Sequence, residues 1–174
     1  MALQEVTLDA AYIERAQTLL EYLSAHFADP DGGFFLSSDE GEQLPIRQKE
    51  TYDGALPSGN SLMAYNLVRL HKLTGTYERQ TNTQLSFMAG QAKENPSHHT
   101  LFLLALLDHT DPPVTVTVVT EQPLSLSSLV RTLPEGTVCT LRAPDAQYRL
   151  KDGQTTYYVC RDGRCLPAEN TLFL

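Results

Sequence analysis

Apolar residues recur at helical spacing through the first two thirds of the chain. Near the N-terminus they fall every three or four positions opposite a polar side, which predicts an amphipathic helix over residues 9–28. Residues 58–74 are apolar on nearly every side, and this pattern predicts a helix that is buried among others. A polar, solvated helix is expected over 77–93 and an inner helix over 97–109. We therefore expect four antiparallel helices in two hairpins.

The apolar period changes from about 3.6 residues to 2 residues after Pro112-Pro113. A strand–helix–strand order follows, which favours a parallel pair of strands with a right-handed crossover. The sequence therefore predicts an α+β protein, with helical hairpins over residues 1–111 and a small α/β subdomain over 112–174. The elements expected in the subdomain are a β-branched strand, a short helix and two further strands, over residues 114–119, 124–133, 137–141 and 155–161.

A short internal repeat relates two parts of the helical region. The residues around 3–15 resemble those around 70–79, with a period of about 65 to 67 positions. Such a period can hold one helical hairpin with a long loop. In this interpretation residues 1–7 are the end of an earlier helix, and the chain starts partway through an array of hairpins.

Composition excludes some classes of partner. The formal charge is −8, from 13 basic and 21 acidic residues, and the basic residues are scattered, which argues against nucleic-acid binding. No apolar stretch approaches the roughly 20 residues of a membrane span. The N-terminus lacks the basic and apolar regions of a secretion signal, so we expect a soluble, cytoplasmic protein.

The densest group of chemically informative residues covers positions 49–61, where a long loop ends and a buried helix begins. Ser58 can cap the first amides of that helix, and the same amides together with the helix dipole can hold an anion or a sugar hydroxyl. Tyr52, Asp53 and Asn60 would then supply directional hydrogen bonds. Helix capping alone also explains most of these residue types, so the sequence leaves a structural role and a ligand site open.

This segment carries a recognisable resemblance. Residues 52–61, with Asn66-Leu67 and 70–75, are closely similar to the C-terminal half of the spermatogenesis-associated-type thioredoxin-domain proteins. Gly32-Gly33-Phe34-Phe35 and Tyr158-Val159-Cys160 match as well, so the similar strings span nearly the whole chain. The resemblance implies a parent protein with an N-terminal thioredoxin-like domain that carries Cys-x-x-Cys. A six-hairpin α/α toroid related to sugar epimerases and glycosidases would follow it.

The chain itself contains no Cys-x-x-Cys and has too few expected helices for a twelve-helix toroid. The resemblance therefore implies a partial toroid of about four helices. By position it places Asp53, Ser58 and Asn60 at the toroid mouth, where relatives bind sugars. The full set of candidate ligand-binding residues adds their neighbours in the loop: Lys49, Glu50, Tyr52, Asp53, Ser58 and Asn60.

The implied function is a C-terminal portion that is not catalytic alone, takes no cofactor and contributes one wall of a carbohydrate-like pocket. Glycoside hydrolysis needs two carboxylates across the substrate, and Glu50 and Asp53 are only three positions apart in one loop. Sugar epimerisation needs a general base, and this loop holds no histidine. Two alternatives stay open: an interaction module that docks the thioredoxin-like domain of the parent, and an enzyme assembled from several copies.

Cys160 and Cys165 are the candidate redox residues, on either side of Arg161-Asp162-Gly163-Arg164. Asp-Gly suits a type I′ hairpin turn. If the arginines form the hydrogen-bonded pair beside the turn, the cysteines form the next pair, with Cα atoms about 4.5 Å apart. The sequence leaves open a switchable disulfide and a reduced pair, and a reducing compartment favours the second.

No metal site is expected. A structural zinc site needs four ligands, and Cys139 in an apolar strand is predicted to be a core residue. His98 and His99 point to different sides of their helix, and His109 is too far along it to join them. Two hairpins of a ring would also expose apolar flanks, so we expect the isolated chain to form a homodimer.

Overall fold

The computed structural model describes residues 2–42, 44–111, 113–122, 126–134, 136–161 and 164–173. The chain divides into two compact units, each of which is described by itself. One comprises Glu14–Thr110, and the other comprises Met1–Ile13 together with Asp111–Leu174. Helices precede a small mixed sheet along the chain, so the predicted α+β class is confirmed. Among the described helices none has the length and apolar character to cross a membrane.

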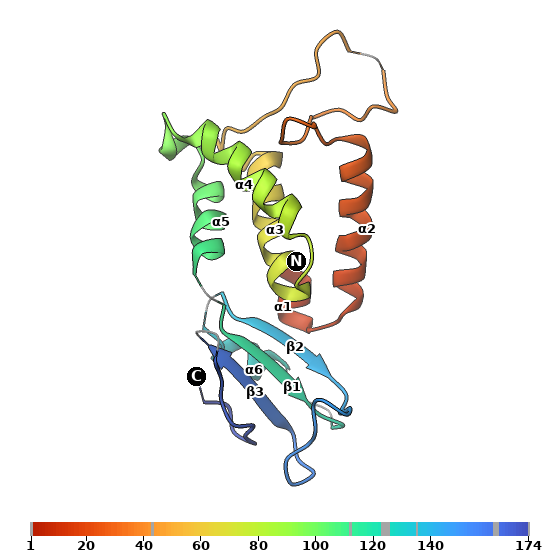
Figure 1. Ribbon diagram of the computed structural model, residues 1–174, viewed down its shortest axis with the longest axis vertical. Helices are drawn as coiled ribbons and strands as arrows, with labels where there is room; N and C mark the ends of the chain where they lie inside the picture. The colour runs from red at the N-terminus through yellow and green to blue at the C-terminus, as the bar shows by residue number, and fades with distance from the viewer. Residues whose placement is uncertain are drawn as a thin grey trace. The chain divides into compact units, whose positions relative to one another are not determined.

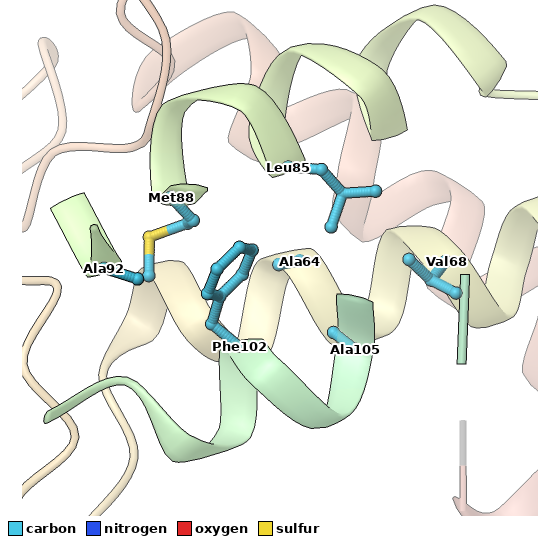
Figure 2. Packing of buried hydrophobic residues seen from close by; sticks show 7 residues of the cluster. All are labelled: Ala64, Val68, Leu85, Met88, Ala92, Phe102 and Ala105. Atoms are coloured by element: carbon cyan, nitrogen blue, oxygen red, sulfur yellow. The ribbon is translucent and has the colours of Figure 1, made fainter. Parts of the chain in front are cut away.

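The first unit is helical. Most of its core comes from α3, which packs against both α4 and α5 (Figure 1). Side chains from these three helices converge in one apolar cluster (Figure 2) made of Ala64, Val68, Leu85, Met88, Ala92, Phe102 and Ala105. Its helices are α2 (Ala11–His26), α3 (Gly59–Thr74), α4 (Glu78–Ala92) and α5 (Thr100–Thr110), with a 3₁₀ turn η1 (Pro96–His98) before α5.

Local signals explain where α3 begins and ends. Ser58 is its N-cap, because its Oγ accepts a hydrogen bond from the amide of Ser61 at 3.1 Å. Gly75 ends the helix in the left-handed region with φ 70°, and its amide donates to the carbonyl of His71. The predicted bounds of all four helices lie within about three residues of those observed.

Two interpretations of these helices need correction. The sequence predicts an outer, solvated helix over 77–93. Most residues of α4 are exposed, but Thr81 and Gln84 of its polar run are buried on the same face as Leu85 and Met88. The last helix was expected to be an inner one. Only Phe102 and Ala105 of α5 are buried, since a helix that is apolar all round has more apolar surface than two neighbours cover.

The second unit is a small α/β structure. Its sheet has the order β2-β1-β3-β4, and β1 lies between β2 and β3 (Figure 1). β1 pairs with β2 in parallel and with β3 antiparallel, so the predicted parallel pair is confirmed. The elements are α1 (Ala2–Thr7), β1 (Thr115–Val119), α6 (Leu126–Thr132), β2 (Val138–Arg142), β3 (Thr156–Arg161) and β4 (Arg164–Cys165). Residues 124 and 125 of the predicted short helix lie outside the described residues.

The N-terminal segment groups with this α/β unit. Gln4 is buried and its Nε2 donates to the carbonyl of Cys139 at 3.2 Å. Leu8 joins the apolar cluster formed by Val116, Val118, Leu129, Cys139 and Val159. The sequence-based division placed residues 1–13 in the helical part. The structure groups them with the α/β unit, because Gln4 and Leu8 are buried against residues that lie far away along the chain, which no local pattern could show.

Candidate functional site

The side chain of Asn60 clamps the long loop that precedes α3. Its Nδ2 donates to the carbonyls of Phe34 at 2.9 Å and Glu50 at 2.8 Å. Its Oδ1 accepts from the amide of Phe34 at 2.8 Å. The carboxamide thus pairs with Phe34 as a neighbouring strand would, and it holds two points of the loop at the first turn of α3.

Gln84 of α4 completes this clamp. Its Nε2 donates to the backbone carbonyl of Asn60 at 2.9 Å and to Asn60 Oδ1 at 3.2 Å. Both side chains are buried, with 2% of their surface exposed, so their polar atoms depend on these bonds. Gln84 is not recognisable as a site residue from the sequence, because it stands in a polar run. Its spacing of four residues from Met88 was the signal that could have shown it to face the core.

Asp53 joins the starts of two helices. Its Oδ1 accepts from the amide of Ser58 at 2.9 Å, and its Oδ2 accepts from the amide of Leu101 at 2.8 Å. Its own amide donates to the carbonyl of His98 at 2.7 Å. Burial of the carboxyl raises its pKa, but the hydrogen bonds from Ser58 and Leu101 outweigh burial and hold the pKa of Asp53 below its usual value.

Lys49 fixes the turn that follows α2. Its Nζ lies 2.7 Å from Asp29 Oδ2 and donates to the carbonyl of Gly32 at 2.6 Å. The same ammonium lies 4.8 Å from the ring centroid of Phe87, within cation–π distance. The hydrogen bond from Lys49 is the main reason that the pKa of Asp29 is lowered.

Glycine is required where the turn meets α4. Gly33 has φ +78°, and a Cβ built on it would lie 2.4 Å from Cε1 of Phe87. A side chain at position 33 would therefore require the ring of Phe87 to move.

The six predicted ligand residues thus divide into two groups. Lys49, Asp53, Ser58 and Asn60 make the internal hydrogen bonds described above, and these bonds fix the loop and the helix starts. Glu50 and Tyr52 have exposed side chains, and the ring of Tyr52 makes an edge-on contact with His98 at 5.1 Å. The six lie along the end of the loop and the first turn of α3, and the structure shows a structural role for four of them.

A hollow of about 300 Å³ with a mixed polar and apolar lining lies beside the clamp. It is formed by the end of α2, the turn after α2 and one side of α4. Asp29 reaches it from the turn, where Lys49 holds its carboxylate, and Gln84 reaches it from α4. The lining residues are Ser24, Ala28, Asp29, Gly32, Gly33, Phe34, Arg79, Gln80, Thr83 and Gln84.

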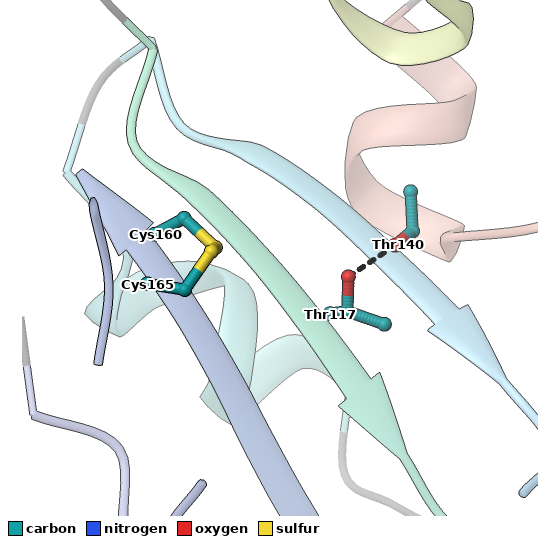
Figure 3. Close-up of a disulfide and its surroundings, with 4 residues drawn as sticks. All are labelled: Thr117, Thr140, Cys160 and Cys165. Carbon is teal, nitrogen blue, oxygen red and sulfur yellow. Dashed lines mark hydrogen bonds between the residues drawn. A yellow bond between two sulfur atoms is a disulfide. The ribbon is translucent and has the colours of Figure 1, made fainter. Parts of the chain in front are cut away.

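The candidate redox residues lie in the α/β unit. Cys160 and Cys165 are opposite each other in the register of β3 and β4, and a disulfide joins them (Figure 3). The amide of Leu166 donates to the carbonyl of Val159 at 2.8 Å, which makes the cysteines the non-hydrogen-bonded pair that the spacing indicated. Their Cα atoms are 3.9 Å apart. The predicted turn residues Asp162 and Gly163 lie outside the described residues.

Cys139 is a buried free cysteine, as predicted. Burial raises the pKa of its thiol to about 11. Within the described ranges no group of three or more His, Cys, Asp and Glu side chains is arranged to hold a metal ion.

Comparison with known proteins gives similarity over part of the chain. Over 75 residues it is 44% identical to spermatogenesis-associated protein 20 of Mus musculus, Rattus norvegicus and Homo sapiens. The chain has homologues of that name. The match covers 42% of this chain and 10% of each relative, so the chain spans about a tenth of the length of these proteins. No family model matches the sequence.

Proposed function

We propose that this chain is part of a larger cytoplasmic protein in which its helices belong to an α/α toroid. In this proposal the helical unit lines one wall of a carbohydrate-binding pocket and is not catalytic alone. The observation that carries it is the hollow beside the Asn60 clamp, where polar side chains lie at an otherwise largely apolar surface. The matched relatives support a larger parent protein, because the aligned 75 residues are only 10% of their length.

The chemistry of the hollow suits a sugar. Ser24 and Thr83 offer hydroxyls, Gln80 offers an amide, and Arg79 and Asp29 offer a charged donor and a charged acceptor. A volume of about 300 Å³ is at the lower end of small-molecule sites, as expected for one wall of a pocket that further elements complete.

The clamp would serve this site by positioning it. Asn60 and Gln84 fix the start of α3 against α4, and Lys49 holds the carboxylate of Asp29 at the edge of the hollow. These are positioning residues in the proposal, and the hydroxyls and charges of the hollow would contact the ligand.

The arrangement favours binding over hydrolysis. Asp29 is the one carboxylate among the described residues that line the hollow, whereas glycoside hydrolysis needs two on opposite sides of the bond. A second carboxylate would have to come from another part of the larger protein.

A comparison of two arginine variants tests the proposal. Monosaccharide binding to the full chain would be measured by saturation-transfer NMR at millimolar sugar. Arg79→Ala removes a donor from the hollow and is expected to weaken binding about tenfold or more. Arg15→Ala removes the same charge from an exposed position on α2 that does not line the hollow, and it is the matched control. Equal binding by both variants, or no transfer to any sugar, would contradict the proposal.

A further inference from the structure

We infer that the Cys160–Cys165 disulfide is a thiol–disulfide exchange site, which a dithiol reductant opens while the fold stays intact. The site belongs to the α/β unit, and none of its residues lines the proposed sugar site. The two proposals therefore stand or fall separately.

Both cysteines of the disulfide are at least partly exposed. Cys165 is exposed and lies on β4, the two-residue strand at one edge of the sheet order, while Cys160 is half-buried on β3 (Figure 3). Exchange begins with attack of a thiolate on one sulfur of the disulfide, and access decides which sulfur is attacked. The more exposed Cys165 is therefore the expected point of attack, and Cys160 is the leaving thiolate.

Charge near the disulfide favours opening. Arg161 follows Cys160 and Arg164 precedes Cys165. Because side chains alternate along a strand, both arginines project from the opposite face of the β3–β4 pair, and their charge acts on the sulfurs at long range, which is strongest at low salt. Asp162 is the one acidic residue of the segment, which leaves its formal charge positive. Positive charge stabilises a thiolate, and a stabilised leaving thiolate speeds exchange and makes the disulfide easier to reduce.

The fold does not depend on the disulfide. β3 is paired along its length with β1, and Val159 is buried in the apolar cluster of the unit. The segment after β4 is tied to β3 by backbone hydrogen bonds between Leu166 and Val159 and between Glu169 and Tyr157. The cysteines are only 5 positions apart, so the bond closes a short loop and restricts the unfolded chain less than a bond that closes a longer loop.

The exchange balances as a two-electron transfer. One thiolate of the dithiol attacks Cys165 Sγ, the Cys160–Cys165 bond breaks, and the electron pair leaves on Cys160 as a thiolate that takes up a proton. The second thiol of the reductant, as its thiolate, then attacks the mixed disulfide and releases Cys165 as a thiol. The protein gains two thiols and the reductant becomes a disulfide.

Counting thiols on the native full chain tests the inference. The chain would be incubated with dithiothreitol at neutral pH, alkylated and weighed intact. Two alkyl groups are expected to appear together while the far-ultraviolet circular dichroism is unchanged, and buried Cys139 is expected to stay unmodified. A requirement for denaturant, or loss of the circular dichroism signal when the thiols appear, would overturn the inference.

Two further measurements distinguish an exchange site from a disulfide that is merely exposed. With excess glutathione, a monothiol, peptide mapping is expected to find the mixed disulfide on Cys165, and a mixed disulfide on Cys160 would contradict the assignment. The double variant Arg161→Gln/Arg164→Gln is expected to slow exchange about threefold at low salt. Arg131→Gln, which removes an exposed charge on α6, is expected to leave the rate unchanged. Equal rates in all three proteins would overturn the role of the arginines.

Discussion

The side chain of Asn60 exchanges two hydrogen bonds with the backbone of Phe34, 26 positions away along the chain. A third bond from the same amide to the carbonyl of Glu50 closes the loop from its other end. One buried carboxamide thus sets the path of the loop, and the hollow lies where that loop meets α4.

Asn60→Ala is expected to destabilise the helical unit by about 3 kcal/mol, because it leaves backbone groups of Phe34 and Glu50 without partners. Urea unfolding would measure the loss, and limited proteolysis is expected to cut the loop faster. Asn66→Ala is the control, since Asn66 is exposed on the same helix. Similar unfolding free energies for the two variants would show that the clamp contributes little.

The lowered pKa of Asp53 predicts that the free energy of unfolding depends on pH. Because the folded state lowers the pKa of Asp53, its carboxylate contributes stability above the unfolded pKa of about 4, and this contribution is lost as the pH falls through the lower folded pKa. Asp53→Asn is expected to cost about 1–2 kcal/mol at neutral pH, since one oxygen that accepts an amide becomes a donor.

Unfolding of the wild type and the variant would be measured between neutral pH and about pH 3. The difference between them is expected to shrink toward acid. Glu94→Gln, at an exposed position, is the control for a general change of charge. A difference that stays constant with pH would contradict the role of the ionised Asp53.

Alanine substitutions at two glycines, one in the turn and one in α4, are expected to change stability in opposite directions. Gly33→Ala is expected to destabilise by roughly 2–4 kcal/mol, because the left-handed φ and the contact with Phe87 both oppose a Cβ. Gly90→Ala in α4 meets nothing within 4 Å and is expected to stabilise by about 0.5–1 kcal/mol. Thermal unfolding would compare them. Equal shifts of Tm would refute the close approach of the turn to Phe87.

Formation of a homodimer stays a prediction, and the exposed leucines of α5 are the expected interface. Leu103, Leu104 and Leu107 form one stripe, and the latter two are 57% and 58% exposed. Light scattering at micromolar concentration is expected to find a dimer that Leu104→Lys converts to a monomer. Thr110→Lys, at an exposed position of the same helix, is expected to leave the dimer intact. A wild-type monomer of 19.3 kDa would rule the dimer out.

The helices and the capping of α3 could be predicted from the sequence, because each rests on residues within a turn or two of one another. The parallel strand pair followed from the order of its elements, since a strand–helix–strand unit favours parallel pairing. The clamp could not be predicted in this way. Its bonds join Asn60 to Phe34 and to Gln84, which lie 26 and 24 positions away, and an asparagine beside a cap has the same local pattern whether it binds a ligand or a loop.

The same limit applies to burial. The pattern showed that α5 is apolar, but the share of its surface that neighbours cover depends on packing between distant segments. The N-terminal segment gave no local sign that Gln4 would bond to Cys139, 135 positions away.

The proposed sugar site is tested most directly by an amide NMR titration of the full chain with a panel of hexoses, uronic acids and amino sugars. At least one of them is expected to shift the resonances of the residues around the hollow, centred on Asp29, Arg79 and Thr83, and the shifts are expected to saturate at millimolar concentration. The absence of saturable shifts with every sugar, or shifts confined to residues away from the hollow, would contradict the proposed site.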